Sequence, residues 1–276
     1  MLSTTPFFQF KNGLYTGNEG ARGPWSADAC HAGPPSAALA REIEQLCEKQ
    51  LVRITINLGR PVPMAGFRID ARILKEGRNT AYATAELKNS DGIVCAEANA
   101  LFHSRSELPE FNRKRTEALS MVAVSTFLEK GDECEPARKG ELRLPSSGFG
   151  GAVEKLVPAD KPAGFTDGAI PGDPGEMWMR TPNLVEGEDM SGFQRVCPMA
   201  DCINALSINL DTRLFQFMNT DLTIALHRIP SADSEWFGMR GSANCHTDGL
   251  ATSCGTLFDE KGCIGTAMQN IMLRSR

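Results

Sequence analysis

Asp201 stands in surroundings that are unusual for a charged side chain. It lies within residues 198–206, PMADCINAL, a segment with apolar residues on most sides. We expect Pro198 to open a buried helix, so that Asp201 lies in the first turn, where the helix dipole stabilises a carboxylate by roughly 0.3–1 kcal/mol. A partly buried carboxylate within reach of water can instead act as a general base. From the residues alone, both interpretations are open.

Gln269 and His31 are the other polar residues at positions where chemistry is possible. Gln269 replaces an apolar residue midway along the last predicted strand, and its counterpart in the internal repeat described below is Asn99. A tolerated amide and a hydrogen-bonded core amide both explain that position. His31 lies at the entry to a predicted helix, where a polar group can meet a ligand phosphate or an acyl carbonyl. A histidine that only caps the turn is the alternative.

Composition and missing motifs exclude several function classes. The chain has 29 basic and 34 acidic residues, a net charge of −5, and lacks the basic stripe of a nucleic-acid binder. The G-x-S-x-G, G-x-x-x-x-G-K-[ST], H-E-x-x-H and G-x-G-x-x-G motifs of serine hydrolases, P-loop proteins, zinc proteases and dinucleotide binders are missing. No apolar run approaches the ~18 residues of a membrane-spanning helix. The sequence thus argues against nucleic-acid partners and against a membrane span.

The nine cysteines indicate a reducing compartment. Their number is odd and no C-x-x-C pair is present, which argues against a disulfide framework and against a zinc site. The first eight residues lack the basic start and apolar core of a secretory signal. We therefore expect a cytoplasmic protein with unpaired cysteines, no metal and no cofactor.

The elements that must position these residues recur along the chain. Residues 54–60, ITINLGR, match residues 222–228, LTIALHR, at an offset of 222 − 54 = 168. Residues 92–99, GIVCAEAN, match residues 262–269, GCIGTAMQ, at an offset of 269 − 99 = 170. Residues 92–99 and residues 262–269 each follow a turn signal, NSDG (89–92) and DEKG (259–262), as expected for the second strand of a hairpin. The matched order and spacing indicate an internal duplication.

Each half shows the same order of elements, an upstream strand, a helix and four strands. In the first half the helix begins at Gly33, and alternation or apolar runs predict the strands. The predicted strands of the two halves span residues 7–16, 51–60, 66–75, 79–89 and 93–104, and residues 176–185, 218–229, 235–246, 249–259 and 263–274. One helix per antiparallel sheet predicts an α+β fold in which each sheet wraps its helix.

The composition changes between the halves. From residue 131 to 175, prolines and glycines make up 15 of 45 residues, which is typical of a connection. The sequence therefore predicts an N-terminal domain at 1–115, a linker at 116–165 and a C-terminal domain at 166–276. Residues 113–129, which overlap the start of this linker, can form a helix.

These motifs resemble the acyl-CoA thioesterase II (TesB-like) family. The matching segments are WMR (178–180), MAD (199–201), NTDLTIALHR (219–228), EW (235–236), LFDEKG (257–262), AMQ (267–269) and, in the first half, HAGPP (31–35). Members of this family have a double hotdog fold, two tandem repeats that each wrap an antiparallel sheet around a central helix. The resemblance implies this fold and acyl-CoA as the substrate.

The resemblance also implies a site. By motif position the catalytic residues are Asp201, Asn219 and Gln269, and Asn219 stands where the family has Thr or Ser. Thr220 and His31 are possible accessory residues. The implied chemistry is attack on the thioester carbonyl by a water that Asp201 activates, with no acyl-enzyme, no metal and no cofactor. Arginines at strand ends, Arg60, Arg228 and Arg274, are candidates to bind the anionic CoA.

Two other functions compete with the hydrolase. A non-hydrolytic acyl-thioester binding protein on the same fold explains the loss of the hydroxyl at Asn219. A hotdog hydratase pairs Asp with His in a short motif on its helix, and Asp201 has no such neighbour in the sequence. Because hotdog sheets often pair edge to edge, a homo-oligomer is also possible.

Overall fold

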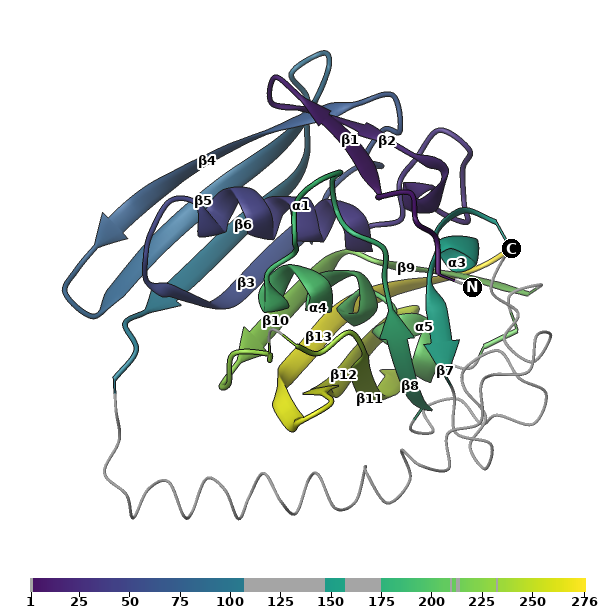
Figure 1. The fold of residues 1–276 in the computed structure, drawn as a ribbon. Coiled ribbons are helices and arrows are strands. Elements are labelled where there is room, and N and C mark those ends of the chain that lie inside the picture. Colours follow the sequence, from purple (N-terminus) through teal and green to yellow (C-terminus); the bar gives the residue numbers. More distant parts are fainter. Residues whose placement is uncertain (1, 107–146, 157–174, 209, 212–213, 232) are drawn as a thin grey trace, which may run out of the picture.

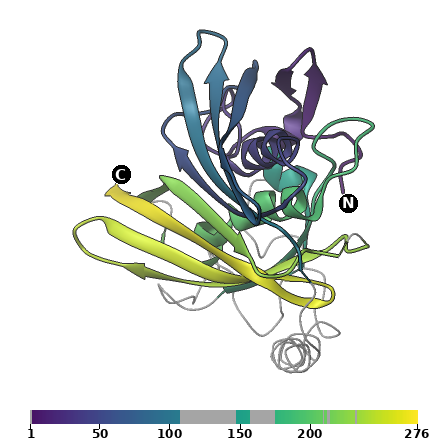
Figure 2. The same cartoon turned by 90° about the vertical axis from the view of Figure 1, so that its left-hand side faces the viewer.

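A computed structural model describes residues 2–106, 147–156, 175–208, 210–211, 214–231 and 233–276. Within these ranges a single antiparallel sheet runs through the molecule, and the helices lie on its concave side (Figures 1 and 2). The strands are β1 (Phe8–Lys11), β2 (Leu14–Gly17), β3 (Gln50–Leu58), β4 (Phe67–Glu76), β5 (Thr80–Asn89), β6 (Val94–His103), β7 (Glu154–Leu156), β8 (Gly175–Arg180), β9 (Phe215–Asn219), β10 (Asp221–Leu226), β11 (Phe237–Cys245), β12 (Leu250–Asp259) and β13 (Gly262–Ser275). The helices are η1 (Glu19–Ala21), α1 (Gly33–Glu44), α3 (Gly148–Ala152), α4 (Gly192–Ala200) and α5 (Ile203–Ser207).

The predicted helix at Gly33 and the four strands that follow it are confirmed. Helix α1 carries prolines at 34 and 35 in its first turn, where their missing N–H groups cost no intrahelical bond. Its buried face, which includes Leu39 and Ile43, packs on β3, β4 and β5. The predicted first strand is instead the hairpin β1–β2. Asn12 and Gly13, both at positive φ, form its turn, as the Asn-Gly pair favours.

Strands β3 and β10 join the two halves of the sheet. They pair antiparallel, with Thr55 opposite Thr223 and Ile54 opposite Ile224. On either side the order is mirrored, β6-β5-β4 beyond β3 and β13-β12-β11 beyond β10. The segments that repeat at an offset of 168 are therefore the two strands that meet at the centre of the sheet.

The register corrects one expected equivalence. Thr55 pairs with Asn99 on β6, whereas Thr223 pairs with Met268 on β13. The counterpart of Asn99 is therefore Met268, and both are exposed, while Gln269 is fully buried. The expected match of Asn99 with Gln269 is wrong by one residue, and such a slip moves a side chain to the other face of the sheet.

The position of Asp201 in its helix also differs from the expectation. Helix α4 begins after Ser191, whose Oγ accepts a hydrogen bond from the Gln194 N–H at 3.1 Å. Pro198 consequently lies inside α4, and Asp201 caps its C-terminal end. The expected position in the first turn of a helix opened by Pro198 is therefore wrong, because Asp201 lies between the end of α4 and the N-cap of α5, Cys202.

Part of the predicted linker has a defined structure. Within 116–165, residues 148–156 form α3 and β7, and β7 pairs with β8. Phe149 of α3 is buried and stacks on Phe7, with ring centroids 5.9 Å apart. The rest of that segment, apart from residue 147, and the whole of the predicted helix at 113–129 lie outside the described residues.

The cysteines and helices of the described residues carry two further observations. All eight cysteines that the structure describes are free thiols, and Cys134 lies outside these ranges.

None of the helices that the structure describes is long and apolar enough to cross a membrane.

The central pairing can be tested by truncating one buried side chain. Ile224 is fully buried opposite Ile54, so we expect Ile224→Ala to lower the free energy of unfolding by about 2–5 kcal/mol. Met268→Ala, on the outward face of β13, serves as the control and should change it by no more than about 0.5 kcal/mol. Urea titrations measure both values. Equal losses in the two variants would contradict this account of the core.

Candidate active site

Asp201, Asn219 and Gln269 meet on the inner side of the sheet. Asn219 Nδ2 donates to Asp201 Oδ1 at 2.7 Å, and Gln269 Nε2 donates to the same oxygen at 3.2 Å. Gln269 Nε2 also lies 3.1 Å from the Asp201 carbonyl oxygen. Asp201 is 4% exposed and Gln269 is fully buried. Two neutral amides therefore hold one oxygen of a buried carboxylate.

Strand pairing explains why these residues converge. Asn219 is the last residue of β9 and lies opposite Ile271 of β13. Gln269 is two residues from Ile271 on the same strand, so both point to the same face of the sheet. That face is turned toward the end of α4, where Asp201 lies. The curl of the sheet over the helix thus brings together residues that are 68 positions apart in the sequence.

His31 reaches the same carboxylate from the other half of the chain. Its Nδ1 lies 3.1 Å from Asp201 Oδ2, and its side chain is 18% exposed. Its ring stacks on Phe149, with centroids 4.0 Å apart and an interplanar angle of 13°. The two oxygens of Asp201 therefore face different partners, the amides on one side and the imidazole on the other.

A glycine permits this approach. Helices α1 and α4 pack against each other, with the start of α1 next to the end of α4. A Cβ at Gly33 would lie 2.8 Å from Pro198 Cα and 2.9 Å from its carbonyl oxygen, too close for any other residue without a shift. Gly33 thereby allows the loop that carries His31 to reach Asp201.

Burial and polar contacts act in opposite directions on the pKa values of the site. Burial raises the pKa of Asp201, and the partners His31, Asn219, Gly33 and Gln269 offset part of this effect. Burial lowers the pKa of His31, Asp201 acts to raise it, and Lys155 acts to lower it. A carboxyl pKa that moves toward neutral pH suits a general base.

Gln269 contributes one more unusual atom. Its Oε1 is buried and has no hydrogen-bond partner within the part of the chain that the structure describes. Its amide nitrogen is committed to Asp201, so the oxygen cannot be exchanged for the nitrogen without losing those bonds. An unpaired buried acceptor is costly and calls for an explanation.

The other residues considered from the sequence have different roles. Thr220 is exposed, and its hydroxyl donates to the Asn270 carbonyl at 3.3 Å, so it does not join the site. Arg228 pairs with Asp259 and bonds the carbonyls of residues 262 and 263, which is a structural role. Arg60 and Arg274 are exposed.

Sequence reasoning missed two neighbours of the site. Asn204 Nδ2 lies 3.4 Å from Asn219 Oδ1, and it stands three residues after Asp201 in the same apolar segment. That position was the available signal. Phe149 gave no signal, because it lies among glycines that favour an irregular connection.

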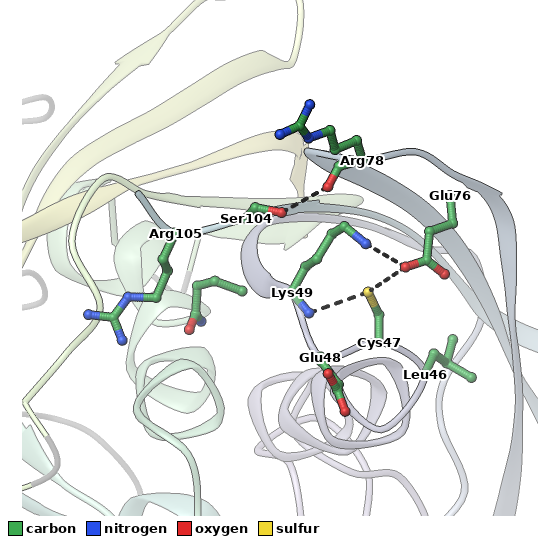
Figure 3. Close-up of a pocket in the computed structure, with 9 residues that line it drawn as sticks. Leu46, Cys47, Glu48, Lys49, Glu76, Arg78, Ser104 and Arg105 are labelled. Atoms are coloured by element: carbon green, nitrogen blue, oxygen red, sulfur yellow. Dashed lines mark hydrogen bonds and ion pairs between the residues drawn. The ribbon is translucent and has the colours of Figure 1, made fainter. Parts of the chain in front are cut away.

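A cavity of about 660 Å³ lies elsewhere, beyond the end of α1 (Figure 3). Lys49, Arg78, Glu76 and Arg105 are among its lining residues, and Lys49 is already paired with Glu76. None of the site residues above lines it. Among the described residues, no group of His, Cys, Asp and Glu is arranged to hold a metal ion.

Solved structures with a similar fold cover nearly the whole chain. A hotdog-fold protein from Alicyclobacillus acidocaldarius has a TM-score of 0.67 at 14% identity, with 98% of this chain and 96% of that chain covered. The tesB protein of Mycobacterium avium subs paratuberculosis has a TM-score of 0.62 at 15% identity, with 96% and 94% covered. The acyl-CoA thioesterase II TesB2 of Mycobacterium marinum has a TM-score of 0.62 at 14% identity, with 97% of this chain and 95% of that chain covered. At these identities the likeness establishes the hotdog fold alone.

Family models match both halves of the sequence. Residues 21–103 match the acyl-CoA thioesterase N-terminal domain, and residues 131–273 match the acyl-CoA thioesterase C-terminal domain. No curated protein has a significant match to the chain. Because the second match alone spans more than half of the sequence, the chain belongs to the acyl-CoA thioesterase family and is a thioester hydrolase.

Proposed function

We propose that the chain hydrolyses acyl-CoA thioesters with Asp201 as the general base and with Asn219 and Gln269 as the residues that position the base and the attacking water. One observation carries the proposal. A buried carboxylate, held at Oδ1 by two amide donors, lies beside the unpaired acceptor Gln269 Oε1. A water between these groups can donate one hydrogen to Asp201 and the other to Gln269 Oε1, which leaves its lone pair free for attack.

The reaction then needs no covalent enzyme intermediate. The water oxygen forms a bond to the thioester carbonyl carbon as Asp201 accepts a proton. The tetrahedral intermediate collapses, the C–S bond breaks, and the leaving thiolate takes the proton back from Asp201. The products are the free acid and CoA. The start of α1 offers few donors for the oxyanion, because prolines occupy positions 34 and 35 and the Gly33 N–H already serves His31 and Asp201.

Asn219 can replace the hydroxyl that the family has at this position. Its amide nitrogen donates to the base at 2.7 Å, as a Thr or Ser hydroxyl at this position would. This contact supports a hydrolytic enzyme over a non-hydrolytic acyl-thioester binding protein.

The contact between His31 and Asp201 supports one second candidate. An Asp–His pair is the arrangement of a hotdog hydratase, although here the two residues come from different halves of the chain. An enoyl-CoA substrate separates the two functions. Hydrolysis releases a free thiol, whereas hydration consumes the double bond and releases none.

We propose two tandem hotdog domains, at 1–115 and 166–276, for this chain. The mirrored strand order about β3 and β10 and the separate matches of the two halves support two domains, and the second match begins at residue 131, within the predicted linker at 116–165. A cytoplasmic location is in keeping with the eight free thiols of the described residues. A homo-oligomer remains a prediction.

Replacing Asp201 tests the assignment of the base. We expect Asp201→Asn to lower the rate of thiol release from a panel of acyl-CoAs by about 100-fold or more, since general-base catalysis contributes roughly 10²–10⁴. Asn219→Ala should also lose activity, while Asn219→Thr, which restores a hydroxyl donor, should keep or increase it. Met268→Ala is the control. Parent-like rates for Asp201→Asn would rule out Asp201 as the base.

The pH dependence of the reaction gives a second test. Burial raises the pKa of Asp201, and the base must be ionised to accept a proton. We therefore expect kcat/KM to decrease on acidification, with an apparent pKa above about 3.9, the ordinary aspartate value. Activity that is constant down to about pH 4 is incompatible with the raised pKa.

The raised pKa also predicts that ionised Asp201 destabilises the folded protein. The folded protein binds a proton at Asp201 more tightly than the unfolded chain, so this contribution to stability is present below the ordinary carboxyl pKa and is lost as the pH rises through the folded-state pKa. We expect Asp201→Asn to raise the Tm by a few degrees at neutral pH, since ~1 kcal/mol shifts it by roughly 2–4 °C at this size. The gap should narrow on acidification. A lower Tm for the variant at neutral pH would refute the cost of ionisation.

A further inference from the structure

His31 has a fixed position in the site. Its backbone N–H donates to the Ala21 carbonyl at 2.8 Å, and its ring stacks on Phe149 at 4.0 Å. Two residues later, Gly33 lies against Pro198 at the end of α4. The backbone, the ring face and the start of α1 are therefore each held, and the Nδ1 edge of the ring is directed at Asp201 Oδ2, 3.1 Å away.

The distance requires a proton between these two atoms. Without one, the lone pairs of Nδ1 and Oδ2 would face each other at 3.1 Å, which is repulsive. The Gly33 N–H, 3.2 Å from Nδ1, is placed to donate either to Nδ1 or to the Asp201 carboxylate. The carboxylate takes this N–H when Nδ1 carries its own proton. All three groups are then satisfied, with Nδ1–H and the Gly33 N–H both donating to Asp201.

We propose that His31 is a positioning residue for the general base, a neutral imidazole that donates Nδ1–H to Asp201 Oδ2 and so turns Oδ1 toward Asn219 and Gln269. This inference rests on the proposed role of Asp201. It assigns to the first half of the chain a part in the chemistry of the second half.

The charges around the ring agree with a neutral donor. The groups that act on His31 are Asp201 at the end of α4 and Lys155 on β7, whose amine donates to the Gly150 carbonyl at 2.7 Å. Burial lowers the pKa of His31, Asp201 opposes this, and Lys155 adds to it. The ring is thus uncharged near neutral pH, and what it supplies to Asp201 is a directed hydrogen bond.

Two substitutions separate the hydrogen bond from the packing of the ring. His31→Asn places an amide N–H near the position of Nδ1 and removes the ring, whereas His31→Phe keeps the stack on Phe149 and removes the donor. For His31→Phe we expect kcat/KM to fall by roughly 10- to 100-fold, the effect of removing a hydrogen bond to a charged group. The acid limb of its pH profile should also move to higher pH, because the ionised form of Asp201 loses a donor. His31→Asn should keep most of the activity and the parent limb.

These variants can also overturn the proposal. Parent-like kcat/KM and pH limb in His31→Phe would do so. A loss in His31→Asn as large as that in His31→Phe, with the acid limb unmoved in both, would show that only the ring's packing matters.

A measurement without substrate keeps the inference separate from the proposed function. The chain has four histidines, so the imidazole ¹⁵N signals of His31 can be identified from the signals missing in His31→Asn. In the parent we expect a neutral ring protonated at Nδ1. In Asp201→Asn the pKa of His31 should fall, because the carboxylate that raises it is gone. An unchanged tautomer and pKa in Asp201→Asn would refute the contact. If the parent hydrolyses no acyl-CoA, the proposed function fails, whatever these signals show.

Discussion

Strands β3 and β10 pair through a register that sets Thr55 opposite Thr223. Because these residues occupy equivalent places in the repeated sequence, the pairing arranges everything else on the two sides in mirrored order. It sets α1 and α4 side by side on the concave face, with the start of α1 at the end of α4 (Figure 1). The loop before α1 and the residue after α4 are thereby adjacent, and the site lies where they meet.

The site carries an energetic cost that the rest of the fold must offset. The ionised form of a carboxylate with 4% exposure is disfavoured by burial. Gln269 Oε1 adds a buried acceptor without a partner among the described residues. Such groups persist where the surrounding structure holds them in place, here the long strand β13 and the packed helices, and they are typical of positions kept for chemistry.

The sequence predicted most of the strands and brought the residues of the site to attention, but the details that it missed share a cause. Alternation and turn signals are local, so β3 to β6 followed from them, and the Asn12-Gly13 turn was equally readable. The start of α4 at Gly192 was obscured by Pro198, a residue that often occupies the first turn of a helix. The one-residue offset between Asn99 and Gln269 depends on pairing with a distant strand. The contacts of His31 with Phe149 and Asp201 join three segments far apart in the chain, and no local pattern encodes them.

The close contact of Gly33 with Pro198 has a mechanical meaning. A Cβ at residue 33 would lie only 2.8 Å from Pro198 Cα, so the two helices approach so closely at this point that no room is left for a methyl group. His31 is attached to one helix and Asp201 to the other, so their contact reports this spacing directly. A change in the spacing of α1 and α4 would alter the distance between His31 Nδ1 and Asp201 Oδ2 without breaking any strand pairing. The chemistry of the molecule is therefore more sensitive to the docking of its halves than the fold itself is.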